Sequence, residues 1–254
     1  MSPLKLKTGI VYGPIESRRL RKSLGINLSP TAFKACSFNC VYCHYGWTEY
    51  LKADLSEIQN DLPEPDEVKD ALEHYLKRGT EFDYITFSGN GEPTLHPQFE
   101  KIVDLVVETR DHYCSEKKVA ILSNSSMLHN KEVLNALGRI DLRIMKLDCG
   151  NAETFARVNR PHDSVDYPKI IGNLRGMKNI VIQTMLVDGE WGNANDKQIK
   201  DWIDRVGEIR PDFVQLYSLE NPPAEASLGG VSRKRLEQIA KETEEKTGVK
   251  VEIY

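Results

Sequence analysis

The chain has 254 residues, of which 40% are hydrophobic and 28% are charged, a balance typical of a globular protein that buries a core. Its formal net charge of −4 gives no overall attraction for nucleic acid. No apolar run approaches the ~20 residues that a helix needs to cross a bilayer, so we expect no membrane partner.

Two short strands are expected at the start of the chain, over 8–17 and 23–30, as an N-terminal extension that covers residues 1–30. Between them, Ser17–Lys22 places four cations in six residues. This segment is typical of a solvated basic loop, and it also suits a contact with a phosphate or carboxylate. The sequence leaves both interpretations open.

Six strand–helix units make up the predicted core over 31–220. Short runs rich in β-branched or aromatic residues predict the strands, and longer amphipathic segments predict the helices. The strands are expected over 31–35, 83–88, 118–124, 141–148, 179–187 and 212–219, and the helices over 65–78, 97–110, 130–138, 167–177, 196–208 and 231–246. Alternating strands and helices imply a parallel sheet.

Six units are too few to close an eight-fold barrel. We therefore predict an α/β fold, a partial (β/α)6 TIM-like barrel with a parallel sheet and outer helices. A last helix and a strand over 249–254 form the C-terminal part, residues 221–254. No linker divides the chain, so we expect a single domain over 1–254.

Three cysteines, Cys36, Cys40 and Cys43, follow the first expected core strand within eight positions. In a parallel barrel, the loops after the strands form the face that carries active sites. Three thiolates in one loop suit zinc or an iron–sulfur cluster. Zinc needs a fourth ligand, and the nearby candidate, His44, directly adjoins Cys43. A cubane with three protein thiolates and one open iron needs no fourth residue.

The cysteine spacing, with the aromatic Tyr42 just before the third cysteine, resembles the signature of the radical S-adenosylmethionine (SAM) superfamily. The resemblance implies that the three cysteines hold a [4Fe-4S] cluster at the catalytic centre, and that the open iron binds SAM. It also implies that Tyr42 and the backbone near His44 contact the adenine. A structural metal site and a chance group of buried thiols stay open as alternatives.

A glycine-rich segment, Phe87–Pro97, follows the second expected core strand. Glycine permits backbone conformations closed to other residues, so a ligand can approach closely, although a turn before a helix has the same composition. The segment resembles the Gly-Gly-Glu element of the same superfamily. By this resemblance, Gly89, Asn90 and Gly91 surround the amino group of the cofactor's methionine. The Glu92 carboxylate then faces that ammonium in a charge-assisted hydrogen bond.

Polar residues end two further strands at the same expected edge of the sheet, and Gln183 lies within the strand that follows them. The resemblance assigns Ser123 and Asn124 to the ribose or the methionine carboxylate, with a turn or helix cap as the alternative. Lys146 and Asp148 share one face because strand side chains alternate, and inside a barrel they would need each other or a ligand. Gln183 is expected to point inward, either toward the cofactor or into the core.

Four other residues have open roles. Cys149 is typical of a small buried side chain, and the alternative is a thiol that donates a hydrogen atom to a substrate radical. Arg160 could bind an anion or form a surface ion pair. Gln215 and Tyr217, on the sixth expected strand, could point inward.

The resemblance also implies the chemistry. A reduced cluster passes an electron to SAM, whose C–S bond breaks to give methionine and a 5′-deoxyadenosyl radical, and this radical takes a hydrogen atom from the substrate. The protein aims the radical and excludes water. A low-potential donor such as flavodoxin or ferredoxin is expected to reduce the cluster. Five cysteines without a secretory segment predict a reducing, cytoplasmic location.

Over roughly residues 8–240 the chain resembles the Fe–S oxidoreductases related to wyosine synthase. Those synthases carry extra cysteines for a second cluster, whereas only Cys114 and Cys149 remain here. The broad basic surface of a tRNA enzyme is also missing. We therefore expect one cluster and a small or nucleoside-like substrate. The alternatives are an activating enzyme of the glycyl-radical type that acts on a protein, a tRNA-modifying enzyme and a non-enzymatic metal-binding protein.

Overall fold

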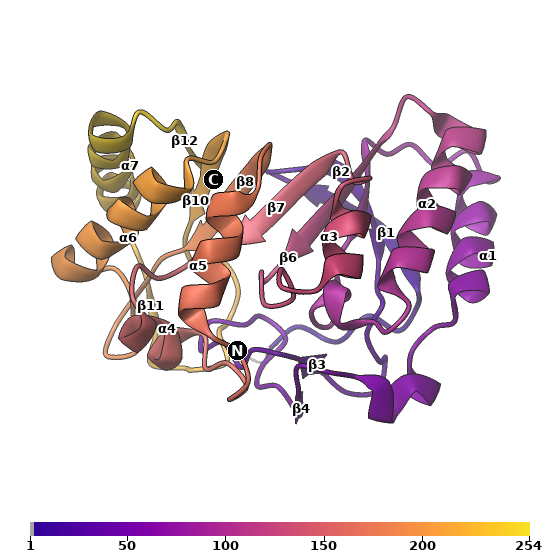
Figure 1. The fold of residues 1–254 in the computed structure, drawn as a ribbon, viewed down its shortest axis with the longest axis horizontal. Coiled ribbons are helices and arrows are strands. Elements are labelled where there is room, and N and C mark those ends of the chain that lie inside the picture. Colours follow the sequence, from indigo (N-terminus) through magenta and orange to yellow (C-terminus); the bar gives the residue numbers. More distant parts are fainter. Residues whose placement is uncertain (1–2) are drawn as a thin grey trace.

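The computed structural model describes residues 3–254, and an eight-stranded sheet forms its centre (Figure 1). Neighbouring strands follow the order β1-β2-β5-β6-β7-β8-β10-β12. These strands are β1 (Val11–Ser17), β2 (Arg21–Ile26), β5 (Tyr84–Phe87), β6 (Lys118–Ser123), β7 (Leu142–Lys146), β8 (Ile180–Met185), β10 (Phe213–Tyr217) and β12 (Val251–Ile253). All neighbouring pairs from β2 to β12 are parallel, and β1 is antiparallel to β2.

Seven helices surround the sheet in the described part of the chain (Figure 1). They are α1 (Pro65–Leu76), α2 (Phe99–Cys114), α3 (Lys131–Leu137), α4 (Ala152–Val158), α5 (Tyr167–Gly176), α6 (Asp196–Ile209) and α7 (Arg233–Thr247). Helices adjacent in sequence pack on one another, as in α1 with α2 and α5 with α6. The predicted α/β partial barrel with outer helices is therefore confirmed. None of these helices, over residues 3–254, has the length and apolar character to span a bilayer.

The helices form where capping groups and apolar spacing agree. At the start of α6, the Asn195 side chain accepts from the Gln198 backbone and the Gln198 side chain accepts from the Asn195 backbone, which satisfies two N–H groups. α4 was not predicted from the sequence. Its signals are an Asn151 cap on the Thr154 N–H and a buried apolar turn with Phe155.

The prediction that residues 31–35 form the first core strand is wrong. Only Ala35–Cys36 form a strand there, β3, and it pairs with β4 (Tyr50–Leu51) outside the main sheet. β2, expected in the N-terminal extension, takes its place beside β5. A strand in a parallel sheet is covered on both faces. Ser23–Ile26 is buried throughout, whereas Thr31 and Ala32 are both exposed, and this difference selects β2.

The two faces of the sheet have separate cores. On the outer face, apolar residues such as Ile85 and Ile121 belong to the large core shared with the helices. On the inner face, Ala120, Ile144 and Val181 pack with Leu20 in a small cluster of their own. Above this cluster the inner face becomes polar. The inner face of the sheet is therefore apolar at this cluster, and its polar side chains lie nearer to the carboxyl ends of the strands.

The turn between β1 and β2 contacts β10, near the opposite edge of the sheet. The Arg19 guanidinium lies 4.3 Å from the centre of the Tyr217 ring on β10, and Arg18 forms an ion pair with Glu220. Four strands separate β2 from β10 in the sheet. In a flat sheet β2 and β10 would lie about 24 Å apart, which is five spacings of about 4.8 Å. The sheet is therefore curled, and this turn lies across its open side.

Candidate active site

The loop that carries the three cysteines is pinned by backbone hydrogen bonds. The Cys43 N–H donates to the Cys40 carbonyl at 3.1 Å, which forms a turn around the last two cysteines. The Val41 N–H donates to the Val158 carbonyl at the end of α4 at 2.9 Å. All three cysteines are half-buried free thiols. The loop is therefore a fixed scaffold that holds its sulfurs beside the carboxyl ends of the strands.

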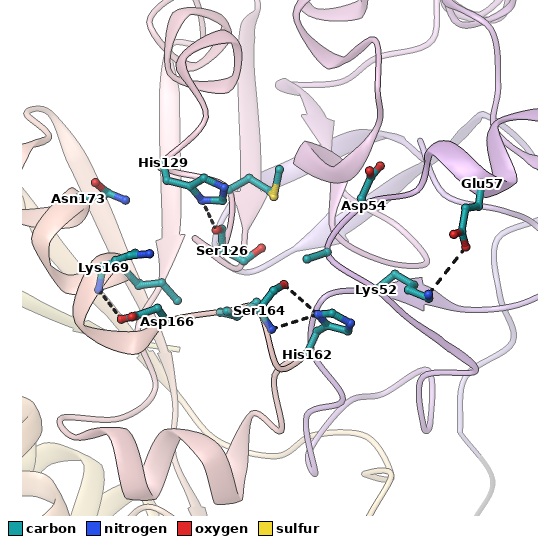
Figure 2. A pocket seen from close by; sticks show the side chains of 14 residues that line it. Lys52, Asp54, Glu57, Ser126, His129, His162, Ser164, Asp166, Lys169 and Asn173 are labelled. Atoms are coloured by element: carbon teal, nitrogen blue, oxygen red, sulfur yellow. Dashed lines mark hydrogen bonds and ion pairs between the residues drawn. The ribbon is translucent and has the colours of Figure 1, made fainter.

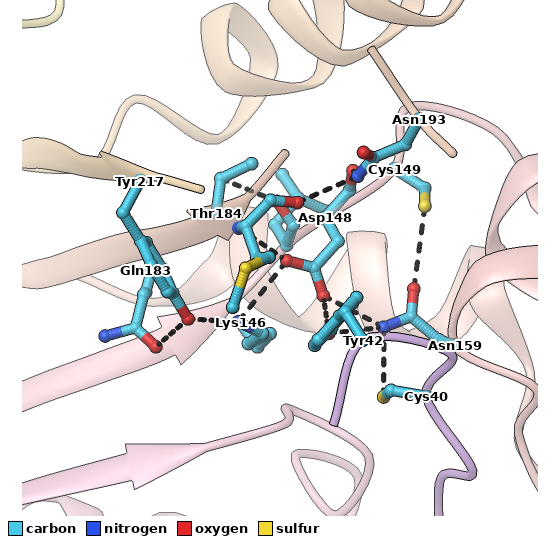
Figure 3. Close-up of polar contacts among 12 residues, drawn as sticks. Cys40, Tyr42, Lys146, Asp148, Cys149, Asn159, Gln183, Thr184, Asn193 and Tyr217 are labelled. Carbon is cyan, nitrogen blue, oxygen red and sulfur yellow. Dashed lines mark hydrogen bonds and ion pairs between the residues drawn. The ribbon is translucent and has the colours of Figure 1, made fainter. Parts of the chain in front are cut away.

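Amide donors surround two of the sulfurs. The Phe38 N–H lies 3.5 Å from Cys36 Sγ, and Asn124 Nδ2 lies 3.7 Å from the same atom. Asn159 Nδ2 lies 3.5 Å from Cys40 Sγ (Figure 3). Hydrogen bonds to sulfur stabilise negative charge on a thiolate or on a cluster. Sequence analysis missed Asn159, because its place next to Cys40 depends on how α4 packs.

A buried cation lies beside the same loop. Lys34 is 3% exposed, and its ammonium donates to the Gly46 carbonyl at 2.8 Å. Burial lowers the pKa of Lys34, but its interactions with the neighbouring cysteine side chains raise it by more, so the pKa is raised overall. Lys34 is therefore a cation at neutral pH, and it would offset the negative charge that the sulfurs acquire when they bind a metal or a cluster. Its position two residues before Cys36 was the only signal in the sequence.

The Cys36 and Cys40 thiols of the unloaded chain keep their protons at neutral pH. Burial raises the pKa of Cys36 to about 12, although Lys34 lowers it. Burial and the Asp148 charge raise the pKa of Cys40 to about 11. A metal must therefore displace protons from these thiols when it binds.

The donor set of this loop fits an iron–sulfur cluster. It offers soft thiols, N–H donors near the sulfurs and a buried cation, which together suit an anionic cluster. Over residues 3–254, no three His, Cys, Asp or Glu side chains converge on one metal-ion position. A four-iron cluster is larger than a single ion, so its three cysteine ligands attach at different corners.

The glycine motif packs directly on the cysteine loop. A Cβ atom at Gly91 would overlap the carbonyl oxygen of Ala35, the residue before Cys36. Gly89 has φ +136°, and a Cβ there would overlap the Asn27 side chain. Both positions therefore require glycine. The close approach of Gly91 to Ala35 brings the two motifs together.

Asn90 and Glu92 have protein partners in this structure. The Asn90 side chain is buried and donates to the carbonyls of Lys7 and Pro30, both at 2.9 Å. The Glu92 carboxylate accepts from Ser123 Oγ at 2.9 Å and from the Asn124 N–H at 2.5 Å, and it caps Thr94.

Both side chains therefore tie loops together. Burial raises the pKa of Glu92, and hydrogen bonds from the Asn124 and Thr94 groups act in the opposite direction. Three of its four hydrogen bonds reach Oε1 and only the Asn124 N–H reaches Oε2, so Oε2 can still accept a further hydrogen bond. The assignments of Gly89 to Glu92 to the cofactor stay predictions.

Asn124, directly after β6, connects that strand with the cysteine loop. Its Nδ2 donates to Ser37 Oγ at 2.8 Å in addition to approaching Cys36 Sγ. Ser123 is engaged with Glu92. The two residues are thus close to the cysteine loop, and their contacts with a ribose or carboxylate stay predictions.

A buried polar network runs from the cysteine loop across the inner face (Figure 3). The Asp148 carboxylate accepts from the Tyr42 hydroxyl and from Asn159 Nδ2, and Lys146 Nζ lies 3.4 Å from it. Lys146 also donates to the Tyr217 hydroxyl at 2.8 Å. Lys146 and Asp148 thus share a face and pair with each other, the first of the two expected outcomes, and a contact of either with a ligand stays a prediction.

Gln183 continues this network on the inner face. Its carbonyl accepts from the Tyr217 hydroxyl at 3.2 Å, and its amide donates to Gln215 at 3.1 Å. Burial raises the pKa of Tyr42 well above its usual value, and the charge of Asp148 adds to this effect. Burial lowers the pKa of Lys146, but the interactions with Asp148 and Tyr217 raise it by a larger amount, so the lysine is a cation. The Tyr42 ring, assigned to the adenine, is thus fixed by its hydroxyl.

Cys149 and Arg160 both contact other side chains of the protein. Cys149 is buried and lies 3.5 Å from Asn159 Oδ1, as expected for a small core side chain. The Arg160 guanidinium lies between two indoles, 4.9 Å from the Trp47 ring and 4.6 Å from the Trp191 ring. This stacking was not predicted, because Trp47 and Trp191 are far apart in the sequence.

His44 has a half-buried imidazole whose Nδ1 has no hydrogen-bond partner within the described chain. Burial, together with the charges of Lys146 and Arg19, lowers its pKa to about 4. The unfolded chain binds a proton on this residue below about pH 6.5. The folded chain binds that proton only below about pH 4. The neutral form of His44 therefore contributes to the free energy of unfolding above pH 6.5, and this contribution is lost as the pH falls through 4.

We expect the His44→Gln variant of the unloaded chain to show a weaker loss of stability in acid than the natural chain. Between pH 7.5 and 4.5 the difference should be on the order of 2 kcal/mol, discounted for the partial exposure of His44. Urea unfolding at the two pH values measures it. The exposed His74 on α1 provides the control, and His74→Gln should behave as the natural chain does. Equal acid sensitivity in all three chains would contradict the expectation.

A cavity of 560 Å³ opens next to the cysteine loop (Figure 2). Segments after β4, after β6 and before α5 line it, and His129 and His162 lie on its walls. Ser126, on its wall, shares a 2.8 Å hydrogen bond with Ser37. A second cavity, of 380 Å³, lies on the inner face of the sheet and is lined by Gly89 and Gly91. The candidate site is thus bordered by space on two sides.

Comparisons with known proteins agree with these features. A family model described as the radical SAM superfamily matches residues 31–206. A curated relative from Brachyspira hyodysenteriae, named GTPase Obg, is 30% identical over 254 residues, which cover 98% of this chain and 35% of the relative. A UPF0026 protein of Helicobacter pylori is 31% identical over 211 residues, which cover 80% of this chain and 65% of that protein. The chain thus spans 35% and 65% of the length of these two relatives.

The fold is shared with solved structures. The structure of TYW1 with a lysine–pyruvate adduct bound superposes with a TM-score of 0.63 at 14% identity, over 91% of this chain and 76% of that chain. At this identity the likeness shows the fold alone. The family model, by contrast, matches more than half of the chain and includes the three cysteines and the glycine motif. The chain is therefore a member of the radical SAM superfamily and an enzyme of that superfamily, as its cysteine spacing predicted.

Proposed function

We propose that Cys36, Cys40 and Cys43 bind one [4Fe-4S] cluster and that the enzyme uses it to cleave SAM. When bound and reduced, such a cluster supplies the electron that cleaves SAM into methionine and a 5′-deoxyadenosyl radical, which takes a hydrogen atom from the substrate. The observation that carries this proposal is the cysteine loop itself. Its thiols lie among amide donors and a buried cation and pack against the glycine motif.

The surrounding residues have separate tasks in this proposal. Lys34 offsets negative charge at the loop, and Asn124 and Asn159 donate hydrogen bonds to its sulfurs. Asp148 fixes Tyr42 and Lys146, which keeps the wall of the site rigid. A rigid, preorganised wall is what positions a reactive group toward one bond of a substrate.

We also propose that a low-potential protein, such as flavodoxin or ferredoxin, delivers the electron. The substrate is proposed to be a small molecule or a nucleoside. The inner face of the sheet supports this part of the proposal, because its cavity of 380 Å³ lies within the range of small-molecule pockets.

Anaerobic reconstitution with iron and sulfide tests the function. We expect about four irons per chain, as a single cubane requires. With dithionite as reductant, the loaded protein should release 5′-deoxyadenosine from SAM. Variants with alanine at Cys36, Cys40 or Cys43 should lose both properties. Cys114, half-buried at the end of α2, supplies the matched control, and Cys114→Ala should keep both. One zinc per chain and no nucleoside release would overturn the proposal.

A further inference from the structure

The cavity on the inner face has an unusual charge pattern. It occupies 380 Å³ between the N-terminal segment, the β1–β2 turn and the inner side of β5 and β6. Lys7 and Arg19 line it, and none of its described lining residues is an aspartate or glutamate. The cavity therefore presents positive charge without a fixed counter-charge.

These two cations are held by aromatic rings. Lys7 Nζ lies 4.9 Å from the centre of the Tyr12 ring, and the Arg19 guanidinium lies 4.3 Å from that of Tyr217. Among the ion pairs of residues 3–254, neither Lys7 nor Arg19 takes part in one. A ring face orients a cation but leaves its N–H groups free for another partner.

The other cations of the basic segment are placed differently. Arg18 pairs with Glu220 and Lys22 pairs with Glu81, 3.3 Å away, both at the surface. Arg21 is exposed. Lys146 approaches the same Tyr217 ring from within the barrel, but Asp148 neutralises it (Figure 3). Only Arg19 of this segment thus brings an uncompensated charge to the cavity.

Hydroxyl groups complete the walls of the cavity. Tyr12 and Ser88 share a 2.7 Å hydrogen bond, and so do Ser23 and Thr86. Each hydroxyl can donate or accept, so these pairs can turn toward a polar ligand. An arginine that lacks a carboxylate partner favours a planar or tetrahedral oxyanion. The lining therefore fits a small, polar and anionic molecule.

We propose that this cavity binds the enzyme's substrate through a carboxylate or phosphate group that Arg19 and Lys7 neutralise. The inference rests on the proposed function, because Gly89 and Gly91, assigned to the cofactor, line the same cavity. It extends that function by giving the substrate class: a small anion whose charged end lies at the β1–β2 turn. The carboxylate of SAM is another source of the same chemistry, and the test separates the two.

The test uses the reconstituted protein and inorganic phosphate as the probe. We expect saturable phosphate binding by ³¹P NMR titration, and Arg19→Gln should weaken it at least about tenfold, the loss of one charge-assisted contact. Lys7→Gln should weaken it as well, and Arg19→Lys should retain most of it. Arg21→Gln removes the same charge from an exposed site two residues away and should leave phosphate binding unchanged. Circular dichroism verifies that each variant is folded.

SAM binding, measured by equilibrium dialysis on the same proteins, distinguishes the two anions. If the cavity takes the substrate, Arg19→Gln leaves SAM binding unchanged and phosphate does not displace SAM. Loss of SAM binding in Arg19→Gln, competition between phosphate and SAM, or no saturable phosphate binding would each overturn the inference. A protein that carries its cluster and cleaves SAM but fails these tests would retain the proposed function. A protein that holds no cluster but still binds phosphate through Arg19 would contradict the proposed function and would leave the anion site in place.

Discussion

Replacement of Asp148 by asparagine is expected to cost about 3–5 kcal/mol of the free energy of unfolding, the range for breaking a buried ion pair. The Asp148 side chain is fully buried, and its oxygens accept from the Met185 N–H at 2.9 Å and from Tyr42 and Asn159. Asparagine removes the charge and turns an acceptor into an N–H donor. It would leave the Lys146 cation buried without a counter-charge.

Urea unfolding of the unloaded chain at pH 7.5 measures this effect apart from any cofactor. Asp204→Asn, at an exposed site on α6, is the matched control and should change stability by no more than about 0.5 kcal/mol. The double variant Lys146→Met and Asp148→Asn should recover part of the loss, because it no longer buries an unpaired charge. A loss below about 1 kcal/mol for Asp148→Asn alone would contradict the buried pair.

The position of the site could be predicted because it follows from the strand order. In a parallel sheet the carboxyl ends of all strands meet at one edge. Asn124 and Lys146 end neighbouring strands, and both lie beside the cysteine loop or its Tyr42. Side-chain alternation correctly placed Lys146 and Asp148 on one face. Periodicity and order were therefore sufficient wherever a residue lies on or just after a strand.

Loop side chains could not be predicted in the same way, since no period fixes their direction. Asn90 and Glu92 adjoin the two glycines, yet their side chains turn toward Pro30 and the end of β6. Arg160 stacks between two tryptophans from distant loops. Only the packed chain brings such partners together.

The choice of the first core strand failed for a related reason. The runs at 23–30 and 31–35 are both short, and local propensity favours 31–35, which has Thr31 and Phe33 against Ile26 alone in the first run. Burial favours the first run: Leu24 and Ile26 lie inside, paired with β5, whereas Thr31 is exposed. Pairing with a strand some 60 residues later decided the assignment.

Replacement of Lys34 by methionine is expected to make the cluster harder to reduce. Adding an electron to a cluster is favoured by a nearby positive charge, and burial keeps that interaction from being screened by water. Lys34 is 3% exposed and bonded to the Gly46 carbonyl at the end of the cysteine loop. A unit charge at such a place should contribute on the order of 100 mV to the reduction potential. Lys34→Met should therefore shift the potential to more negative values by about this amount.

Redox titration of the reconstituted protein, followed by electron paramagnetic resonance, measures the shift. Lys52→Met is the matched control, because Lys52 lies next to β4, its side chain is 44% exposed and it pairs with the exposed Glu57. Water and salt screen such a charge, so its removal should shift the potential by no more than about 20 mV. Lys34→Arg, which keeps the charge, should remain close to the natural chain if it folds and loads iron. A Lys34→Met protein with full iron content and an unchanged potential would show that this buried ammonium does not act on the cluster.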